Sequence, residues 1–214
     1  MKKNKVFFDM AMSLDGFIAP EGMDMAHADN PEYKQWANKW GELMSWIFPQ
    51  KFFRENLKLG EGGETGENNR LIEETFKRTG VSIMGANMFL LGEKMWPEEA
   101  PFHTPVFVLT DKTRDPWERP GGTTFYFVND GIESALEKAR KVAGDRDIRI
   151  AGGANAVQQY LNAGLVDEFT IHYAPVAFGG GIPLFANINP DIKVKIERII
   201  PSKEVTNVTY QVLK

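Results

Sequence analysis

The chain has 214 residues, no cysteine and a formal net charge of −4 at pH 7. The lack of cysteine excludes disulfide bonds, thiolate zinc sites and cysteine nucleophiles, and the charge gives no reason to expect nucleic-acid binding. No apolar run is long enough to span a bilayer, and Asp9 interrupts the apolar N-terminal segment, so neither a membrane anchor nor a signal peptide is expected. We therefore expect one cytoplasmic domain over residues 1–214.

The first third of the chain predicts a strand, a helix and a loop before a second helix. Residues 6–12 are almost all apolar, which is typical of a strand buried on both faces. Tryptophans recur at helical spacing within residues 33–48. Residues 60–69 are polar, glycine-rich and acidic, which is typical of a mobile loop. Residues 71–78 form the next expected helix.

The middle of the chain alternates between strands and helices. Short apolar or β-branched runs predict strands at residues 81–84, 105–109 and 123–128. An apolar stripe at helical spacing predicts a helix between Asp130 and Gly144.

The last part of the chain changes character. Residues 148–164 predict a strand, a glycine turn and a helix, and a long strand is expected at residues 166–176. Apolar and polar residues alternate in residues 192–196 and 208–212, which predicts an antiparallel hairpin with one face exposed to water. Strands that alternate with helices before an antiparallel edge predict an α/β fold with a mixed, mostly parallel sheet.

Two strand-to-helix junctions are led by glycine, at Gly85 and at Gly152-Gly153. A helix start leaves backbone N–H groups unpaired at the positive end of the helix dipole, and these favour a phosphate. The alternative is that the glycines only permit tight turns. A basic loop with Lys112 and Arg114 follows another strand. Because ligands of open α/β sheets bind beyond the carboxyl ends of the strands, this pattern predicts a dinucleotide site, although the G-x-G-x-x-G fingerprint is absent.

Five motifs resemble, in order, those of a known family. They are MSLDGFIA at residues 12–19, IMG at 83–85, PVFVLT at 105–110, AGG at 151–153, and GLVDEF at 164–169 continuing to GIPLF at 181–185. Over residues 5–214 the chain resembles dihydrofolate-reductase-like proteins of the riboflavin-biosynthesis reductase (RibD C-terminal) group, as a stand-alone domain with an apparent insertion or mobile loop around residues 40–70. The resemblance implies a three-layer αβα fold and a homodimeric oxidoreductase that transfers hydride from NADPH, like a 5-amino-6-(5-phosphoribosylamino)uracil reductase.

The resemblance also assigns residues to the ligands. The nicotinamide and its ribose would lie against Ala11, Ile18 and Ala19. The phosphates and the adenosine end would be held by three groups of residues: Gly85, Ala86 and Asn87; Gly152, Gly153, Ala154, Asn155 and Ala156; and Thr110, Asp111 and Lys112. The substrate would be bound by Phe17, Trp36, Phe178 and Gly179.

One departure from the family concerns the choice of cofactor. The family often has arginine after the glycine that is Gly85 here, and this chain has Ala86. NADH is therefore the alternative to NADPH. Lys112 or Arg114 could replace the missing arginine, because either side chain can bind a phosphate. The alternative is that both are ordinary solvated loop charges.

A proton donor is needed because the reduction of a C=N or C=O group consumes a proton as well as a hydride. In dihydrofolate reductases an acid on the first helix holds the pterin, and Glu32 is the nearest positional match, with Asp29 next. Asp15 of the SLDG motif is the other candidate. The structural alternatives are a favourable charge at a helix start for Glu32 and Asp29, and a turn for Asp15.

The histidines add no further site. His27, His103 and His172 lack metal-ligand spacing, so no metal is expected. The leading hypothesis is an NAD(P)H-dependent reductase of a small heterocyclic substrate, pterin- or pyrimidine-like, or of a carbonyl compound. The alternative is a nucleotide- or pterin-binding protein of the same fold without significant reductase activity.

Overall fold

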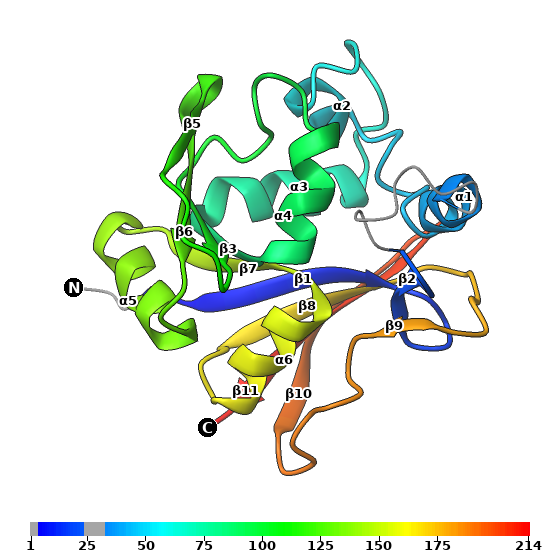
Figure 1. The fold of residues 1–214 in the computed structure, drawn as a ribbon. Helices are drawn as coiled ribbons and strands as arrows, with labels where there is room; N and C mark the ends of the chain where they lie inside the picture. The colour runs from blue at the N-terminus through cyan, green and yellow to red at the C-terminus, as the bar shows by residue number, and fades with distance from the viewer. Residues whose placement is uncertain (1–3, 24–32) are drawn as a thin grey trace.

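The computed structural model describes residues 4–23 and 33–214, and nine of the strands in these residues form one sheet (Figure 1). In chain order they are β1 (Val6–Met12), β3 (Thr79–Gly85), β4 (Val106–Leu109), β5 (Trp117–Arg119), β6 (Thr123–Val128), β7 (Asp147–Gly152), β8 (Glu168–Tyr173), β10 (Lys193–Pro201) and β11 (Thr206–Leu213). Their order across the sheet is β10-β11-β8-β1-β7-β3-β4-β6-β5. The six neighbouring strands from β8 to β6 pair in parallel. The pairs β10–β11, β11–β8 and β6–β5 are antiparallel.

Helices cover both faces of the sheet. They are α1 (Tyr33–Leu43), α2 (Lys51–Asn56), α3 (Glu67–Arg78), α4 (Ala86–Met95), α5 (Ile132–Val142) and α6 (Ala154–Asn162), with a short 3₁₀ turn, η2 (Pro120–Gly122). Figure 1 shows α5 and α6 on one face, with α3 and α4 on the other. A separate two-stranded ribbon joins β2 (Phe17–Pro20) to β9 (Gly181–Pro183) beside the end of β1.

The hydrophobic core lies on both faces because successive side chains of a strand point to opposite sides. In β1, Val6 and Phe8 pack in the cluster that α5 and α6 cover. Ala11 points the other way and packs with Leu43 of α1. On that same side α4 adds Phe89 to a second cluster over β4 and β6.

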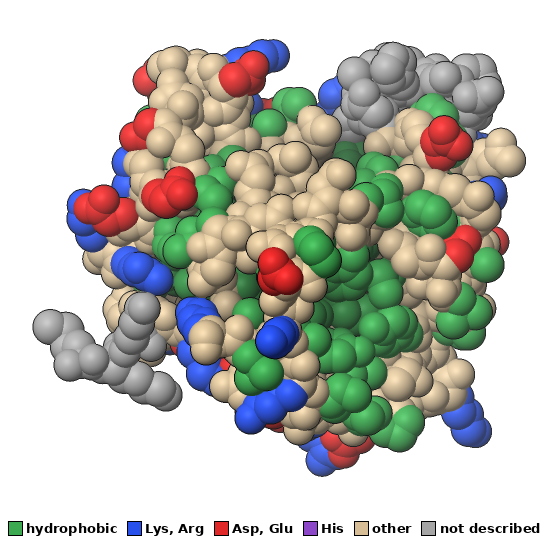
Figure 2. Space-filling view, turned by 90° about the horizontal axis from the view of Figure 1, so that it is seen from below, with side chains coloured by type: hydrophobic (Ala, Val, Ile, Leu, Met, Phe, Trp, Pro, Cys, Tyr) green, Lys and Arg blue, Asp and Glu red, His purple; other side chains and the backbone are tan. Residues whose placement is uncertain are grey.

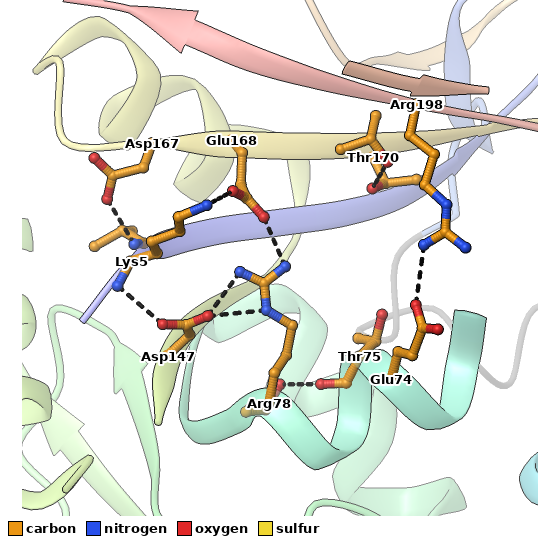
Figure 3. A network of polar contacts seen from close by, with 12 residues as sticks. Lys5, Glu74, Thr75, Arg78, Asp147, Asp167, Glu168, Thr170 and Arg198 are labelled. Atoms are coloured by element: carbon orange, nitrogen blue, oxygen red, sulfur yellow. Dashed lines mark hydrogen bonds and ion pairs between the residues drawn. The ribbon is translucent and has the colours of Figure 1, made fainter. Parts of the chain in front are cut away.

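An ion-pair cluster lies where the parallel strands begin, which we call the amino edge of the sheet (Figure 3). The Arg78 guanidinium, at the end of α3, donates to Asp147 of β7 and to Glu168 of β8 at 2.7 Å each. The Lys5 ammonium, just before β1, donates to the other oxygen of Glu168. Arg78 also lies over the Phe7 ring, 4.0 Å from its centroid. These contacts tie α3 to three strands.

The layered α/β architecture and the C-terminal hairpin predicted from the sequence are confirmed. The hairpin differs from expectation in one respect, because β10 is exposed along nearly its whole length rather than on one face alone. The first helix ends at Leu43 rather than near residue 48. The ribbon of β2 and β9 and the helix α2 were not predicted, because such short elements carry no full hydrophobic period. No helix in the described part of the chain is long and apolar enough to cross a membrane.

Candidate functional site

The parallel strands end at what we call the carboxyl edge of the sheet. A topological switch point lies there, between β3 and β7. These strands are parallel neighbours, and Met84 stands in register with Gly152. The chain leaves β3 into α4 and leaves β7 into α6, and these two helices lie on opposite faces of the sheet (Figure 1). Crevices at such points are where open α/β sheets bind their ligands. The two glycine junctions identified in the sequence therefore meet at the position where a ligand site is expected.

The junctions are close enough to share one ligand. A Cβ atom added to Gly85 would lie 3.9 Å from both the carbonyl oxygen of Gly152 and the amide nitrogen of Gly153. Gly85 and Gly153 are the N-cap residues of α4 and α6, and neither makes a side-chain cap hydrogen bond. A Cβ atom added to Gly153 would meet no atom within 4 Å. Both helix starts thus leave backbone N–H groups for an anion, with open space at Gly153.

Gly152 adopts a backbone conformation that suits glycine. Its φ is +118°, and a Cβ atom there would come within 3.3 Å of the Met10 and Met88 side chains. The peptide bond between Gly152 and Gly153 is cis. A side chain at position 152 would therefore strain the backbone and crowd both methionines.

The other residues assigned to the cofactor lie at the same edge. Leu109, at the end of β4, stands in register with Gly85, so the loop that carries Thr110, Asp111 and Lys112 begins beside the start of α4. Ala11, Ile18 and Ala19 are all buried. Their side chains serve different clusters, because Ala11 packs beneath α1 and Ile18 packs with the core on the α6 side.

The side chain of Arg114 is occupied by intramolecular contacts. It donates to Glu93 of α4 at 2.6 Å. It also lies over the rings of Phe89, Trp117 and Phe127, at 5.2, 5.4 and 4.8 Å from their centroids. The Lys112 ammonium has no ion pair or hydrogen bond within residues 4–23 and 33–214. Of the two candidate phosphate-binding cations, Lys112 is therefore the one that remains available.

The Asp15 carboxylate joins two loops. It accepts hydrogen bonds from the Ser13 hydroxyl at 2.6 Å and from the backbone N–H groups of Phe178 and Gly179, the latter at 2.6 Å. The Ser13 hydroxyl is the largest influence on the Asp15 pKa, and together with the backbone donors it lowers this pKa to about 2. An ionised carboxylate that accepts several hydrogen bonds has no proton to give. The geometry favours a positioning role for Asp15 over the proton-donor role considered from the sequence.

We call the hydrogen bonds from Phe178 and Gly179 to Asp15 the Asp15 latch. An open cleft of about 490 Å³ lies beside it. Its described lining consists of Pro20, Glu21, Gly22, Gln35, Trp36, Lys39, Phe178, Gly179 and Gly180. Three of the four residues assigned to the substrate therefore share one cleft. The fourth, Phe17, pairs with Pro183 in the β2–β9 ribbon and is not part of the lining.

Two charged residues of the cleft, Glu21 and Lys39, were missed from the sequence. Each is a single charged residue, Glu21 in a proline–glycine turn and Lys39 on a helix, and each has the pattern of an ordinary solvated side chain. The ribbon that places Glu21 opposite α1 was itself not predicted. The acids Glu32 and Asp29, proposed from the resemblance, lie outside the described residues, as does His27.

A buried charge cluster lies deeper, where β1, β7 and β8 are adjacent. The Arg149 guanidinium donates to both oxygens of Asp9, at 2.6 and 3.0 Å. The His172 ring packs against Trp46 in a tilted arrangement, 4.7 Å between centroids, and its Nδ1 contacts the Asn207 side-chain oxygen at 2.7 Å. Burial alone would raise the pKa of Asp9, but Arg149 and His172 outweigh it and hold this pKa far below its usual value. Asp9 is therefore a structural anion.

Comparison with protein families decides the relationship. The RibD C-terminal domain model matches residues 4–206. The chain belongs to the RibD C-terminal domain family. Curated relatives of this family member include two uncharacterized proteins of Bacillus subtilis (strain 168). YyaP is 40% identical over 70 residues, which cover 33% of this chain and 37% of YyaP, so the match spans little more than a third of that relative. YwjB is 28% identical over 138 residues, which cover 62% of this chain and 73% of YwjB.

Solved structures share the fold. A candidate riboflavin biosynthesis protein of Shewanella sp. PV-4 superposes with a TM-score of 0.65 at 20% identity, covering 98% of this chain and 99% of its own. The Thermotoga maritima deaminase/5-amino-6-(5-phosphoribosylamino)uracil reductase gives 0.62 at 16% identity, covering 99% of this chain and 57% of its own. Dihydrofolate reductase from Enterococcus faecalis, complexed with NADP(H), gives 0.57 at 14% identity, covering 99% and 98%. The fold is therefore dihydrofolate-reductase-like.

Proposed function

We propose that this protein is an NADPH-dependent reductase of a small heterocyclic or carbonyl substrate. The observation that carries the proposal is the meeting of two uncapped helix starts at the switch point between β3 and β7. The family relationship and the NADP(H)-bound structural neighbour support the same conclusion. When bound, the cofactor would supply the hydride.

The residues at this edge fit a dinucleotide. The N–H groups of α4 and α6 would bind the phosphates, with Gly85 and Gly153 allowing close approach of the backbone. Thr110, Asp111 and Lys112 would face the adenosine end, because their loop begins beside Gly85. The preference for NADPH would rest on the Lys112 ammonium, since Ala86 offers no charge and Arg114 is held by Glu93.

The reduction also needs a proton donor. Glu32 remains our proposed donor, with Asp29 as the second candidate. Asp15 would instead fix the loop that walls the substrate cleft. Trp36 and Phe178 would contact the substrate ring from α1 and from this loop.

The direct test is a titration with NADPH and with NADH. The five tryptophans can transfer excitation energy to the reduced nicotinamide, so binding is read as quenching at the protein emission. We expect saturable binding, tighter for NADPH. No binding of either cofactor at millimolar concentration would sink the reductase proposal. Binding without oxidation across pterins, flavin precursors and quinones would favour a binding protein of the same fold.

We also propose that the protein is a homodimer. The face seen in Figure 2 carries a broad strip of hydrophobic side chains. Val194, Ile196 and Ile199 of the edge strand β10 are 40%, 57% and 54% exposed. A monomer rarely exposes contiguous apolar area of this kind, and a second copy would cover it. Light scattering should give twice the chain mass, and Ile196→Lys should give the monomer; a monomeric wild type would contradict the proposal.

A further inference from the structure

One side chain of α6 holds the ribbon of β2 and β9 by hydrogen bonds. Gln158 is 8% exposed, and its amide nitrogen donates to the carbonyl oxygen of Pro183 at 3.1 Å and to that of Leu184 at 2.9 Å. Pro183 is the last residue of β9, and Leu184 follows it. Because only the nitrogen of a side-chain amide can donate, the two carbonyls also fix the direction in which this amide faces. Gln158 therefore ties the end of the ribbon to α6.

A second amide of α6 binds the chain that follows the ribbon. Asn162 donates to the carbonyl oxygen of Asn187 at 2.7 Å and accepts from the backbone N–H of Asn189 at 2.8 Å. It stands four residues after Gln158, so the two amides lie on the same face of the helix. The two side chains have the same chemistry but hold different parts of the chain, Gln158 the ribbon and Asn162 the loop beyond it.

The ribbon borders both parts of the proposed ligand site. The cleft is lined by residues that follow β2 and by residues that precede β9. Ile18 of β2 packs in the same hydrophobic cluster as Leu184 and Ala154, the first residue of α6. The N-cap of α6 is Gly153, where the phosphate site is proposed. A shift of the ribbon relative to α6 would therefore change the separation between the phosphate position and the residues assigned to the nicotinamide.

We propose that Gln158 is a positioning residue, which sets the β2–β9 ribbon relative to the start of α6 and so aligns the nicotinamide with the bound phosphates. It would act through the ribbon rather than by touching a ligand. Apolar packing is non-directional, whereas two hydrogen bonds from one buried amide define both a distance and a direction. This inference rests on the proposed function, because Ile18 and Ala19 of the ribbon are the residues assigned to the nicotinamide.

The test compares two ligands that share the adenosine end, in calorimetric titrations of the full chain. NADPH carries the nicotinamide, and adenosine 2′,5′-bisphosphate lacks it. Gln158→Met keeps the length of the side chain and removes both donors. We expect this variant to bind NADPH about tenfold more weakly than the wild type, as for the loss of two neutral hydrogen bonds, and to bind the bisphosphate equally well. A merely structural role would weaken both ligands or neither.

Asn162→Leu is the matched control, because it removes an amide of the same helix that binds the loop beyond the ribbon. It should bind both ligands like the wild type, and circular dichroism should show that both variants are folded. If Gln158→Met does not fold, Gln158→Glu gives the same test, since a carboxylate also has no N–H to donate.

Hydrogen exchange reads the position of the ribbon without any ligand. The Leu184 amide donates to the carbonyl oxygen of Gly16 at 3.1 Å, which joins the end of β9 to the turn before β2. We expect this amide to exchange several-fold faster in Gln158→Met than in Asn162→Leu or the wild type. Unchanged exchange at Leu184 in folded Gln158→Met would overturn the inference.

The titrations separate this inference from the proposed function. If the wild type binds NADPH and Gln158→Met loses affinity for both ligands alike, or for neither, the inference alone is overturned. If the wild type does not bind NADPH, the reductase proposal is removed, and the inference that rests on it falls with it.

Discussion

The amino and carboxyl edges of the sheet differ in whether their polar groups are paired within the protein. At the amino edge the charged side chains of Lys5, Arg78, Asp147 and Glu168 bind one another. The charged groups that border a hollow of about 380 Å³ nearby are also paired. At the carboxyl edge two helices start at adjacent glycine N-caps, which make no side-chain hydrogen bond to the first turn. Saturated polar groups stabilise a fold, whereas groups left open at a crevice are available to a ligand. The comparison assigns stability to the first edge and binding to the second.

The largest expected effect is on the amino edge. Arg78→Met keeps an apolar stem over Phe7 but leaves Asp147 and Glu168 without their guanidinium partner. We expect the free energy of unfolding to fall by about 3 kcal/mol, as when one partner of a partly buried ion pair is removed. Arg70→Met on the same helix is the control, because its pair with Glu67 is exposed and should contribute less than about 1 kcal/mol. Urea denaturation measures both values. A loss of NADPH affinity in folded Arg78→Met would contradict the assignment of stability to the amino edge and binding to the carboxyl edge.

The ion pairs of Glu168 should make the stability of the fold depend on pH in the acid range. Burial alone would raise the pKa of Glu168, but hydrogen bonds from Lys5 and Arg78 outweigh it and hold this pKa below its usual 4.5. A lowered pKa in the folded state adds stability that is present above the unfolded value and is lost as the pH falls through the folded value. The free energy of unfolding should therefore decline below about pH 5. Glu168→Gln should weaken that decline, and an unchanged slope would remove Glu168 as its source.

At the carboxyl edge, the Asp15 latch should be visible in hydrogen exchange. Asp15→Asn keeps the shape but replaces a charged acceptor with a neutral amide, so the Phe178 and Gly179 amides lose strong acceptors. We expect both amides to exchange at least about tenfold faster, consistent with the loss of a charge-assisted hydrogen bond. Asp130→Asn, which alters a carboxylate held by Lys138, should leave them unchanged. Equal protection in Asp15→Asn would show that the loop is held by other contacts.

A smaller effect should distinguish Lys112 from Arg114. Lys112→Ala should weaken NADPH about fivefold and leave NADH unaffected, because an exposed charge contributes at most about 1 kcal/mol. Arg114→Ala should instead lower thermal stability, since its guanidinium packs on three aromatic rings. Fluorescence titrations and melting curves measure the pair. A loss of NADPH preference in Arg114→Ala alone would reverse the assignment.

The sequence predicted elements that carry a complete hydrophobic period. Residues 6–12 and the hairpin ending at Val212 were recognised because their patterns extend over many residues. The ribbon of β2 and β9 was missed, because three or four residues rich in proline and glycine have no pattern of their own. The failure to predict β2 also hid Glu21, which follows that strand and lines the cleft.

The site was predicted only as separate parts. Gly85 and Gly153 were each identified as a helix start, but their adjacency follows from the order of the strands, which places β7 beside β3. That order depends on tertiary packing between distant segments. The choice between Lys112 and Arg114 as the phosphate-binding cation also depends on tertiary contacts. Nothing in the sequence shows that Glu93 and three rings surround Arg114.

One measurement tests the central claim most directly, the comparison of Gly153→Asp with Gly66→Asp. Both glycines are helix N-caps with nearly the same φ and ψ, φ −73° and ψ −161° or −162°, and both have open space around an added Cβ. Aspartate is a favourable N-cap, so both variants should fold. At Gly153 the new carboxylate would occupy and repel the phosphate position, and we expect NADPH affinity to fall at least tenfold, about 1.4 kcal/mol. Gly66→Asp should bind like the wild type, and equal affinities in the two folded variants would contradict the placement of the cofactor at this edge.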